Sequence, residues 1–185
     1  MVSNEQINVI KRNGRGKESL DIDKIHSMVG FATEGITGVS ASHVEMNSGL
    51  QFFDGISTDD IQQILIKSAN DLISLESPNY QYVAARLLLF SLRKSLHHRL
   101  WEHPKFITHI KKLVDLGLYD KGILDNYTEA EIDRMGMWID HERDYSFTYA
   151  GLRQVMDKYL VQDRSTGEIF ETCLLYTSPS PRDTG

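Results

Sequence analysis

The sequence predicts a mainly α-helical protein that begins with a small β-hairpin. Apolar residues recur at helical spacing in four segments of the first 100 residues. An Asn-Gly pair separates two short stretches of strand-like sequence near the start of the chain. Hydrophobic residues make up 41% of the 185 residues and charged residues 25%, which is ordinary for a soluble globular protein.

The β-hairpin is predicted from the segment before residue 21. Residues 6–12 place isoleucine and valine before a charged end, which is typical of a strand. Asn13-Gly14 supplies the positive φ that a tight turn needs, and Glu18–Leu20 forms the expected return strand. Asp21 then stands where the N-cap of a helix would be.

Two helices are predicted to follow. The first runs from Ile22 to about Ile36, and the second, which is less regular, begins near Ser40. The apolar stripe of the first helix consists of Ile22, Ile25, Val29, Ala32 and Ile36.

A third and a fourth helix complete the first part of the chain. Residues 54–58 read as a loop in which Ser57 or Thr58 caps the third helix. The apolar face of that helix comprises Ile61, Ile64, Leu65, Ala69, Leu72 and Ile73. Pro78 opens the fourth helix, whose middle, residues 83–90, is apolar almost all round. Such a helix is expected in the centre of a bundle.

The first domain is expected to cover residues 1–100, and a second helical region residues 101–172. In the second region, residues 106–116 predict an amphipathic helix, and Thr128 precedes acids that favour a helix start. Residues 145–159 predict mixed helix, and residues 161–170 predict two short strands around Ser165-Thr166-Gly167.

The end of the chain, residues 173–185, has a different character. It is rich in proline and serine and has no apolar periodicity, so it is predicted to be disordered. Its sequence resembles translated adapter sequence, and we interpret it as a non-native tail.

Charge and cysteine content restrict the classes of function. The net charge of −6 does not favour nucleic-acid or membrane-surface binding. Cys173 is the one cysteine, which excludes a disulfide framework or a CxxC zinc site within the chain. The N-terminal segment lacks the apolar run of a signal peptide, and no apolar stretch is long enough to span a bilayer. We therefore expect a cytoplasmic protein without a membrane partner.

Four cations could converge on an anionic ligand. Lys11 and Arg12 end the first strand, Lys24 lies one turn inside the first helix, and Lys94 lies near the end of the fourth. Nucleotide phosphates need several such cations. Spacing alone favours the alternative of solvated surface lysines, and no GxxxxGK[ST] phosphate-binding loop is present.

Three other groups of polar residues are weaker candidates. His97, His98 and His103 lack the spacing of a metal site and are predicted to be exposed residues at a helix end, so no metal site is expected. The run 140–144 could be acid–base machinery, but a salt-bridged junction between helices is favoured. Cys173 has no histidine nearby in the sequence and is not expected to be a nucleophile.

Several motifs resemble the large subunit of aerobic class I ribonucleotide reductases. The opening resembles the ATP cone, a regulatory domain of that family, in residues 9–14, 21–25, 53–61 and 78–87. The second half resembles the helical segment that precedes the reductase barrel, in residues 119–120, 139–144, 147–149, 158–161 and 166–172. The resemblance covers residues 5–172.

This resemblance implies a fold, a ligand and partners. The fold is a four-helix bundle capped by a small β-structure, which binds ATP as activator or dATP as inhibitor. The one metal that the resemblance allows is Mg²⁺ carried by the nucleotide. The implied nucleotide contacts are Lys11, Arg12, Glu18, Asp21, Lys24, Thr58 and Lys94. The four cations would meet the phosphates, and Asp21 and Thr58 the base or sugar. The intact protein would reduce ribonucleoside diphosphates for DNA synthesis, self-associate and use a radical-generating small subunit, whereas this chain ends before the catalytic cysteines.

Departures from the family pattern leave one alternative open. Gln62 stands where relatives can have histidine, the hairpin carries an extra residue around 15–17, and residues 95–98 are unusual. A cone that retains the fold and assembles subunits without binding nucleotide is the alternative. A zinc-ribbon transcriptional repressor, which also carries an ATP cone, is excluded because it needs four cysteines before the cone.

Overall fold

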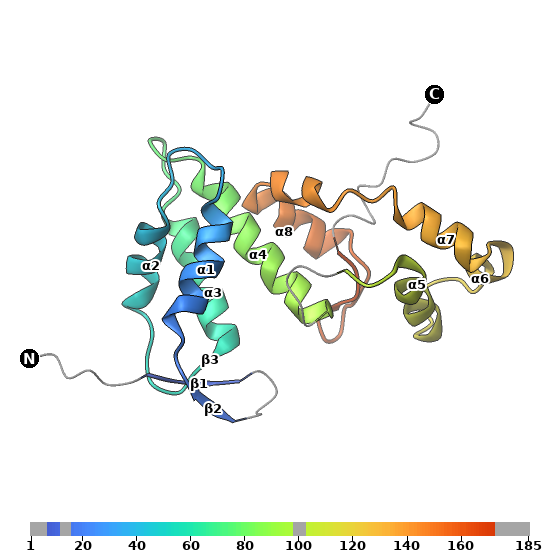
Figure 1. Ribbon diagram of the computed structural model, residues 1–185, viewed down its shortest axis with the longest axis horizontal. Coiled ribbons are helices and arrows are strands. Elements are labelled where there is room, and N and C mark those ends of the chain that lie inside the picture. The colour runs from blue at the N-terminus through green and yellow to red at the C-terminus, as the bar shows by residue number, and fades with distance from the viewer. Residues whose placement is uncertain (1–6, 12–15, 98–102, 173–185) are drawn as a thin grey trace, which may run out of the picture. The chain divides into compact units, whose positions relative to one another are not determined.

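A computed structural model describes residues 7–11, 16–97 and 103–172 (Figure 1). Within these residues the packing divides into two units. The first comprises residues 7–91 together with Phe147–Ala150, and the second comprises Leu92–Ser146 and residues 151–172. The domain boundary expected at residue 100 stays a prediction, because residues 98–102 lie outside the described part of the chain. The turn at Asn13-Gly14 and the tail from Cys173 also lie outside it.

The first unit opens with a three-stranded sheet in the order β2-β1-β3. Strand β1 (Asn8–Ile10) pairs antiparallel with β2 (Lys17–Ser19) and parallel with β3 (Ile56–Ser57). The hairpin was predicted, although β1 is shorter than the expected strand at residues 6–12 and β2 begins and ends one residue before the expected Glu18–Leu20. Strand β3 was missed, because two residues within a predicted loop carry no detectable period.

Helices α1 (Ile22–Thr33), α2 (Ala41–Gly49), α3 (Thr58–Asp71) and the first part of α4 (Tyr80–His97) form the bundle. Figure 1 shows the sheet at one end of α1 and α3. The fold class is therefore as predicted, mainly helical with a small β-cap.

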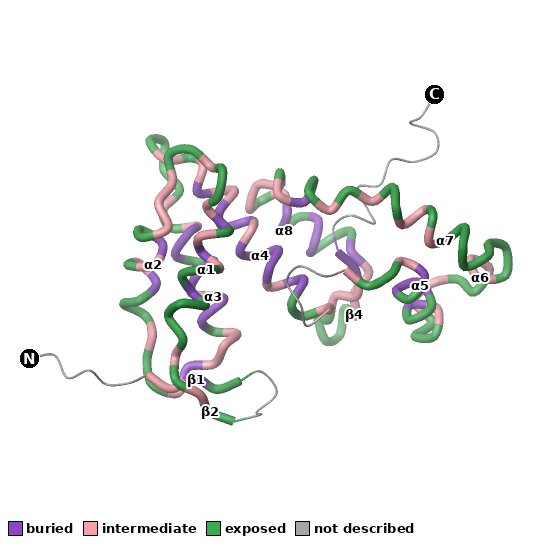
Figure 2. Tube along the Cα trace, viewed as in Figure 1, coloured by how far each residue is buried: buried purple, intermediate pink, exposed green. Residues whose placement is uncertain are grey.

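The apolar stripes predicted for the bundle account for most of its core. Val29, Leu65 and Leu87 are completely buried, and the middle of α4 is buried almost continuously (Figure 2). The prediction that Ile22 belongs to the buried stripe of α1 was wrong, since Ile22 is 70% exposed. The first turn of α1 lies beside the small sheet and beyond the bundle core. Helix α1 also ends before Ile36, ahead of Gly35 at φ +70°.

Polar side chains link the helices of the first unit. Gln62 of α3 donates a hydrogen bond from Nε2 to the Leu87 carbonyl oxygen of α4 at 2.9 Å. Arg86 of α4 donates from Nη1 to the carbonyl oxygen of Glu34, just after α1, at 2.6 Å. The Tyr80 hydroxyl accepts from the Ser40 amide at 3.0 Å.

The second unit contains helices α5 (Phe106–Asp115), α6 (Gly122–Asn126), α7 (Glu129–Gly136) and α8 (Tyr149–Lys158), the 3₁₀ helix η2 (His141–Ser146), and a hairpin of β4 (Gln162–Asp163) and β5 (Glu168–Ile169). The hairpin was predicted around residues 165–167. Thr128 caps α7 and shares a capping box with Glu131, as its spacing indicated.

Helices α5 and α7 form a small core of their own. It contains Ile107, Ile110 and Ile132. Gly136 of α7 lies so close to Phe106 of α5 that an added Cβ would come within 2.5 Å of the Phe106 Cβ. In the part of the chain that the structure describes, no helix is both long and apolar enough to cross a membrane.

Candidate nucleotide-binding site

Two predicted site residues, Lys11 and Glu18, meet across the base of the hairpin. The Lys11 amide donates to the Gly16 carbonyl oxygen at 3.1 Å, which brings the two ends of the hairpin loop together. The Lys11 Nζ lies 2.7 Å from Glu18 Oε2, and both side chains are exposed. The hydrogen bond from Lys11 lowers the pKa of Glu18. The carboxylate therefore stays ionised at neutral pH and can accept hydrogen bonds from a ligand.

Asp21 and Lys24 form a second pair at the start of α1. The Leu20 amide donates to the Ile7 carbonyl oxygen at 2.8 Å, so the pairing with the first strand continues up to the residue before Asp21. Asp21 is the N-cap, as predicted, and its Oδ1 accepts from the Lys24 amide at 3.2 Å. The Lys24 Nζ lies 3.2 Å from Asp21 Oδ2. The Lys24 side chain, and then its backbone amide, lower the pKa of Asp21.

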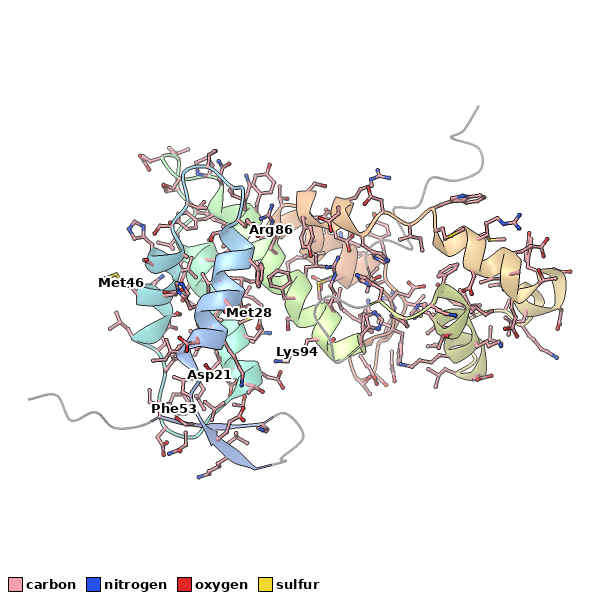
Figure 3. All side chains as sticks on the ribbon, in the orientation of Figure 1. Asp21, Met28, Met46, Phe53, Arg86 and Lys94 are labelled. Atoms are coloured by element: carbon pink, nitrogen blue, oxygen red, sulfur yellow. The ribbon has the colours of Figure 1, made fainter. Side chains whose placement is uncertain are left out.

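A shallow hollow of about 430 Å³ opens beside the Asp21–Lys24 pair. It is lined by residues 19–23, which join β2 to α1. Figure 3 shows Asp21 at the end of α1 that faces the sheet. The amides of a helix N-terminus favour an anion, although Asp21 itself occupies one of these amides here.

Thr58 lies at the same end of the sheet as Lys11. Ile10 of β1 and Ser57 of β3 are paired in parallel register, and Lys11 and Thr58 are the next residue on each strand. Thr58 is also the first residue of α3, whose N-cap Ser57 accepts from the Asp60 amide at 3.0 Å. Asp59 and Asp60 place negative charge in this first turn. The start of α3 therefore suits a hydroxyl-bearing sugar or a base better than a phosphate.

Two members of the predicted set are not brought into this arrangement by the structure. Lys94 lies in the last turn of α4 (Figure 3), a part of the helix that belongs to the second unit. Arg12 lies outside the described residues. The assignment of both as phosphate contacts stays a prediction.

Lys11 and Lys24 are each matched by one carboxylate, Glu18 and Asp21. A phosphate can bind here by taking over a lysine from its carboxylate partner. The displaced carboxylate would then accept hydrogen bonds from ribose hydroxyls or an amino group. The displaced carboxylate keeps its charge, but because it is exposed, water and the neutral donors of the ligand can solvate it.

Gln62 lies inside the helical bundle. It is 6% exposed, and its amide donates to the Leu87 carbonyl oxygen within the bundle. The burial of Gln62 depends on its contact with α4, 25 residues away, so its neighbours in the sequence did not indicate it.

Two of the three histidines predicted to be exposed, His97 and His103, are partly buried instead, and His98 lies outside the described residues. His97 and His103 belong to a cluster with His109 and His141 in the second unit, where His103 and His141 stack with ring centroids 3.5 Å apart. The exposed prediction failed because His109 and His141 come from elements distant in sequence. A pocket of about 630 Å³ adjoins the cluster. Among the described residues no group of three or more histidine or acidic side chains is arranged to hold a metal ion.

The run 140–144 forms a salt-bridged junction, as favoured from the sequence. Asp144 of η2 pairs with Arg93 of α4 at 3.2 Å, and both side chains are buried. In this pair Arg93 Nη2 donates a hydrogen bond to Asp144 Oδ2.

Comparison with known proteins places the chain in a family. Residues 7–95 match the ATP cone domain. The chain is 47% identical, over 91% of its length, to ribonucleoside-diphosphate reductase 1 subunit alpha of Escherichia coli, and 48% identical over the same share to the subunit alpha of Haemophilus influenzae. It is 46% identical, over 90% of its length, to the subunit alpha of Enterobacteria phage T4.

The chain spans only about a fifth of the length of these relatives, 22% in each of the three. Identity close to one half across nine tenths of the chain, together with the matched domain, establishes the relationship for both units. The chain belongs to the ribonucleoside-diphosphate reductase alpha-subunit family, and its residues 7–95 are an ATP cone domain.

Proposed function

We propose that the first unit binds ATP or dATP and acts as the regulatory domain of a ribonucleoside-diphosphate reductase alpha subunit. The observation that carries this proposal is the pairing of Lys11 with Glu18 and of Lys24 with Asp21, on the hairpin and the adjoining start of α1. These pairs combine cations for phosphates with acceptors for the nucleoside. The match of residues 7–95 to the ATP cone supports the choice of an adenine nucleotide.

Lys11, Arg12, Lys24 and Lys94 would contact the phosphates. Glu18, Asp21 and Thr58 would contact the sugar or the base, and Mg²⁺ could accompany the nucleotide. ATP would activate and dATP would inhibit. Opposite effects require that the two nucleotides have different relative affinities for the active and inhibited states of the enzyme.

The intact protein would convert ribonucleoside diphosphates to deoxyribonucleotides for DNA synthesis. It would work with a radical-generating small subunit and would self-associate. The catalytic cysteines of this reaction would lie in sequence that the chain does not contain, so the chain alone would have no reductase activity.

The second candidate is an ATP cone that has lost its nucleotide. Gln62 favours it, because its amide is hydrogen-bonded to Leu87 inside the bundle. Loss of one polar contact weakens binding more often than it abolishes binding, so nucleotide binding remains the first proposal.

Isothermal titration calorimetry of the whole chain tests the choice. ATP or dATP should bind with a dissociation constant in the micromolar range, and Lys11→Ala combined with Lys94→Ala should abolish the signal. Lys67→Ala is a matched control, since Lys67 is an exposed lysine near the far end of α3, paired with Asp71. Absence of heat with either nucleotide would favour the second candidate.

A further inference from the structure

Asp54 joins the first strand of the sheet to the third. It lies two residues before β3, and its Oδ1 accepts two hydrogen bonds from Asn8 of β1, one from the amide at 2.8 Å and one from the side-chain Nδ2 at 2.9 Å. The Gly55 amide donates in turn to the Asn8 carbonyl oxygen at 2.8 Å. We call these three hydrogen bonds the Asn8–Asp54 clamp.

The turn before β3 presents Asp54 to the first strand. The Ile56 amide donates to the Phe53 carbonyl oxygen at 3.2 Å, and Gly55 adopts φ +83°, a left-handed conformation that residues with a side chain rarely adopt. Ile56 is completely buried, so β3 is fixed in the core. The amide of Asn8, and then its side chain, lower the pKa of Asp54. The carboxylate is therefore ionised at neutral pH, and its hydrogen bonds are stronger than those between neutral groups.

The pairing of β1 with β3 is short and needs further support. Its register has two residue pairs and ends at Ile10 and Ser57. Val9 of β1 is buried, whereas Ile10 and Lys11 are exposed. Pairs of short strands are marginally stable by themselves. The end of β1 that carries Lys11 thus has little apolar contact with the core, and the clamp at Asn8 supplies attachment to β3.

The clamp bears on the candidate site through the register of the two strands. Lys11 and Thr58 are the residues that follow Ile10 and Ser57, the last pair of that register. A change in how β1 lies against β3 would therefore move Lys11 relative to Thr58, which begins α3 and is fixed with that helix.

We propose that Asp54 is a positioning residue of the effector site. By fastening β1 to β3, the clamp holds Lys11 beside Thr58, so that one nucleotide contacts both. The inference rests on the proposed function, in which Lys11 meets a phosphate and Thr58 meets the sugar or the base. Asp54 acts through these two residues and does not itself contact the nucleotide. By linkage, a nucleotide held by both residues also stabilises the clamp.

A double-mutant cycle on the whole chain tests this coupling by calorimetry. Asp54→Ala should weaken ATP binding about 5-fold. The same change in a Thr58→Ala background should have no further effect, because the second of the two aligned contacts is absent. Asp54→Asn keeps an oxygen that can accept from Asn8 and should restore most of the affinity. Asp71→Ala removes an exposed carboxylate at the far end of α3, and should leave ATP affinity unchanged.

The Gly55 amide reports on the clamp directly, because it donates to the Asn8 carbonyl oxygen. ATP should slow hydrogen exchange of this amide several-fold in the unaltered chain, and should not slow it in Thr58→Ala. A residue that supports only the fold would not respond to the nucleotide in this way. Exchange that ATP leaves unchanged in the unaltered chain would overturn the positioning role.

The calorimetric results separate the possible failures. If the unaltered chain binds neither ATP nor dATP, the proposed function itself fails. If the unaltered chain binds and Asp54→Ala binds equally well, the positioning role is overturned. If Asp54→Ala weakens binding to the same degree with and without Thr58, Asp54 supports the fold in general, and the inference is overturned. It is also overturned if Asp54→Asn binds no better than Asp54→Ala, since the hydrogen bonds would then not be the cause.

Asn8→Ala provides the test if Asp54→Ala does not fold, as judged by circular dichroism. It removes the side-chain donor to Asp54 and retains the two backbone hydrogen bonds of the clamp. ATP affinity should fall about 2- to 3-fold when Thr58 is present, and should not change when Thr58 is alanine. An equal loss in both backgrounds, or no loss in either, would overturn the inference.

Discussion

Among the groups with shifted pKa values, the first unit has exposed carboxylates, whereas the second unit has buried groups as well. In the first unit, the carboxylates of Glu18, Asp21 and Asp54 are exposed, and donors from Lys11, Lys24 and Asn8 lower their pKa values. In the second unit, hydrogen bonds lower the pKa values of Glu131 and Asp163 in the same way. The second unit also has buried groups: burial raises the pKa of Asp144 to about 6 and is the main cause that lowers the pKa of His103 to about 3.

The difference separates charges that can change partners from charges that the fold needs. An exposed ion pair contributes little stability, so an anionic ligand can replace one member at small cost. A buried pair cannot lose one member without leaving an uncompensated charge. The first unit is therefore suited to reversible binding, and the second uses its charges to hold helices together.

The largest expected effect comes from breaking the buried pair. Asp144→Ala leaves Arg93 buried without its anion and should lower the free energy of unfolding by about 3–5 kcal/mol. Asp54→Ala removes an exposed carboxylate of the first unit and should cost far less. Urea unfolding followed by far-ultraviolet circular dichroism checks this, because helices of both units contribute to that signal. Equal losses in the two variants would refute the comparison.

Acid should destabilise the second unit before the first. His103 has a folded pKa of about 3, below its usual 6.5, because of burial and the nearby charges of His141, Arg93 and His97. The unfolded chain therefore binds more protons between these values, and the stability that His103 contributes is lost as the pH falls from about 6.5 towards 3. The pKa values of His109 and His141 are also lowered, mainly by burial.

Asp144 acts against this trend, since its raised pKa favours the folded state as the pH falls from about 6 to 4. The three histidines outnumber it, so tryptophan-detected unfolding should shift to lower urea between pH 7 and pH 5. His103→Asn should reduce the shift. In the first unit, the carboxylates with lowered pKa values stay ionised at pH 5. A midpoint that does not change between the two pH values would contradict this account.

The smallest expected effect is the same in both units, because helix caps are local. Ser57→Ala removes the cap of α3 in the first unit, and Thr128→Ala removes the cap of α7 in the second. Each should cost about 1 kcal/mol. Amide hydrogen exchange in α3 and α7 measures both losses in the native state, and a several-fold difference between them would show that one cap has a role beyond its helix.

Features encoded by neighbouring residues were predictable from the sequence. The N-cap at Asp21, the capping box at Thr128 and the buried middle of α4 depend on residues within a few positions of each other. The pairing of Asp21 with Lys24 likewise spans one helical turn. The junction at residues 140–144 was recognisable from its density of charge, although its partner Arg93 was not.

Features that join distant residues were not predictable. Strand β3 exists because two residues pair with β1, almost 50 positions earlier. The burial of Gln62 depends on α4, and the histidine cluster joins α4, α5 and η2 to the loop residue His103. A residue's surroundings are set by such contacts, and a single sequence does not specify which distant segments meet.

The central claim is that the first unit, at its sheet end, holds the nucleotide. Amide chemical-shift mapping of the whole chain during titration with ATP tests it most directly. We predict chemical-shift changes in residues 8–11 and 16–24, at the start of α3 and in the last turn of α4. The amides of α5, α6 and α7 should not change. No change at millimolar ATP or dATP, or changes confined to the histidine pocket of the second unit, would contradict the account.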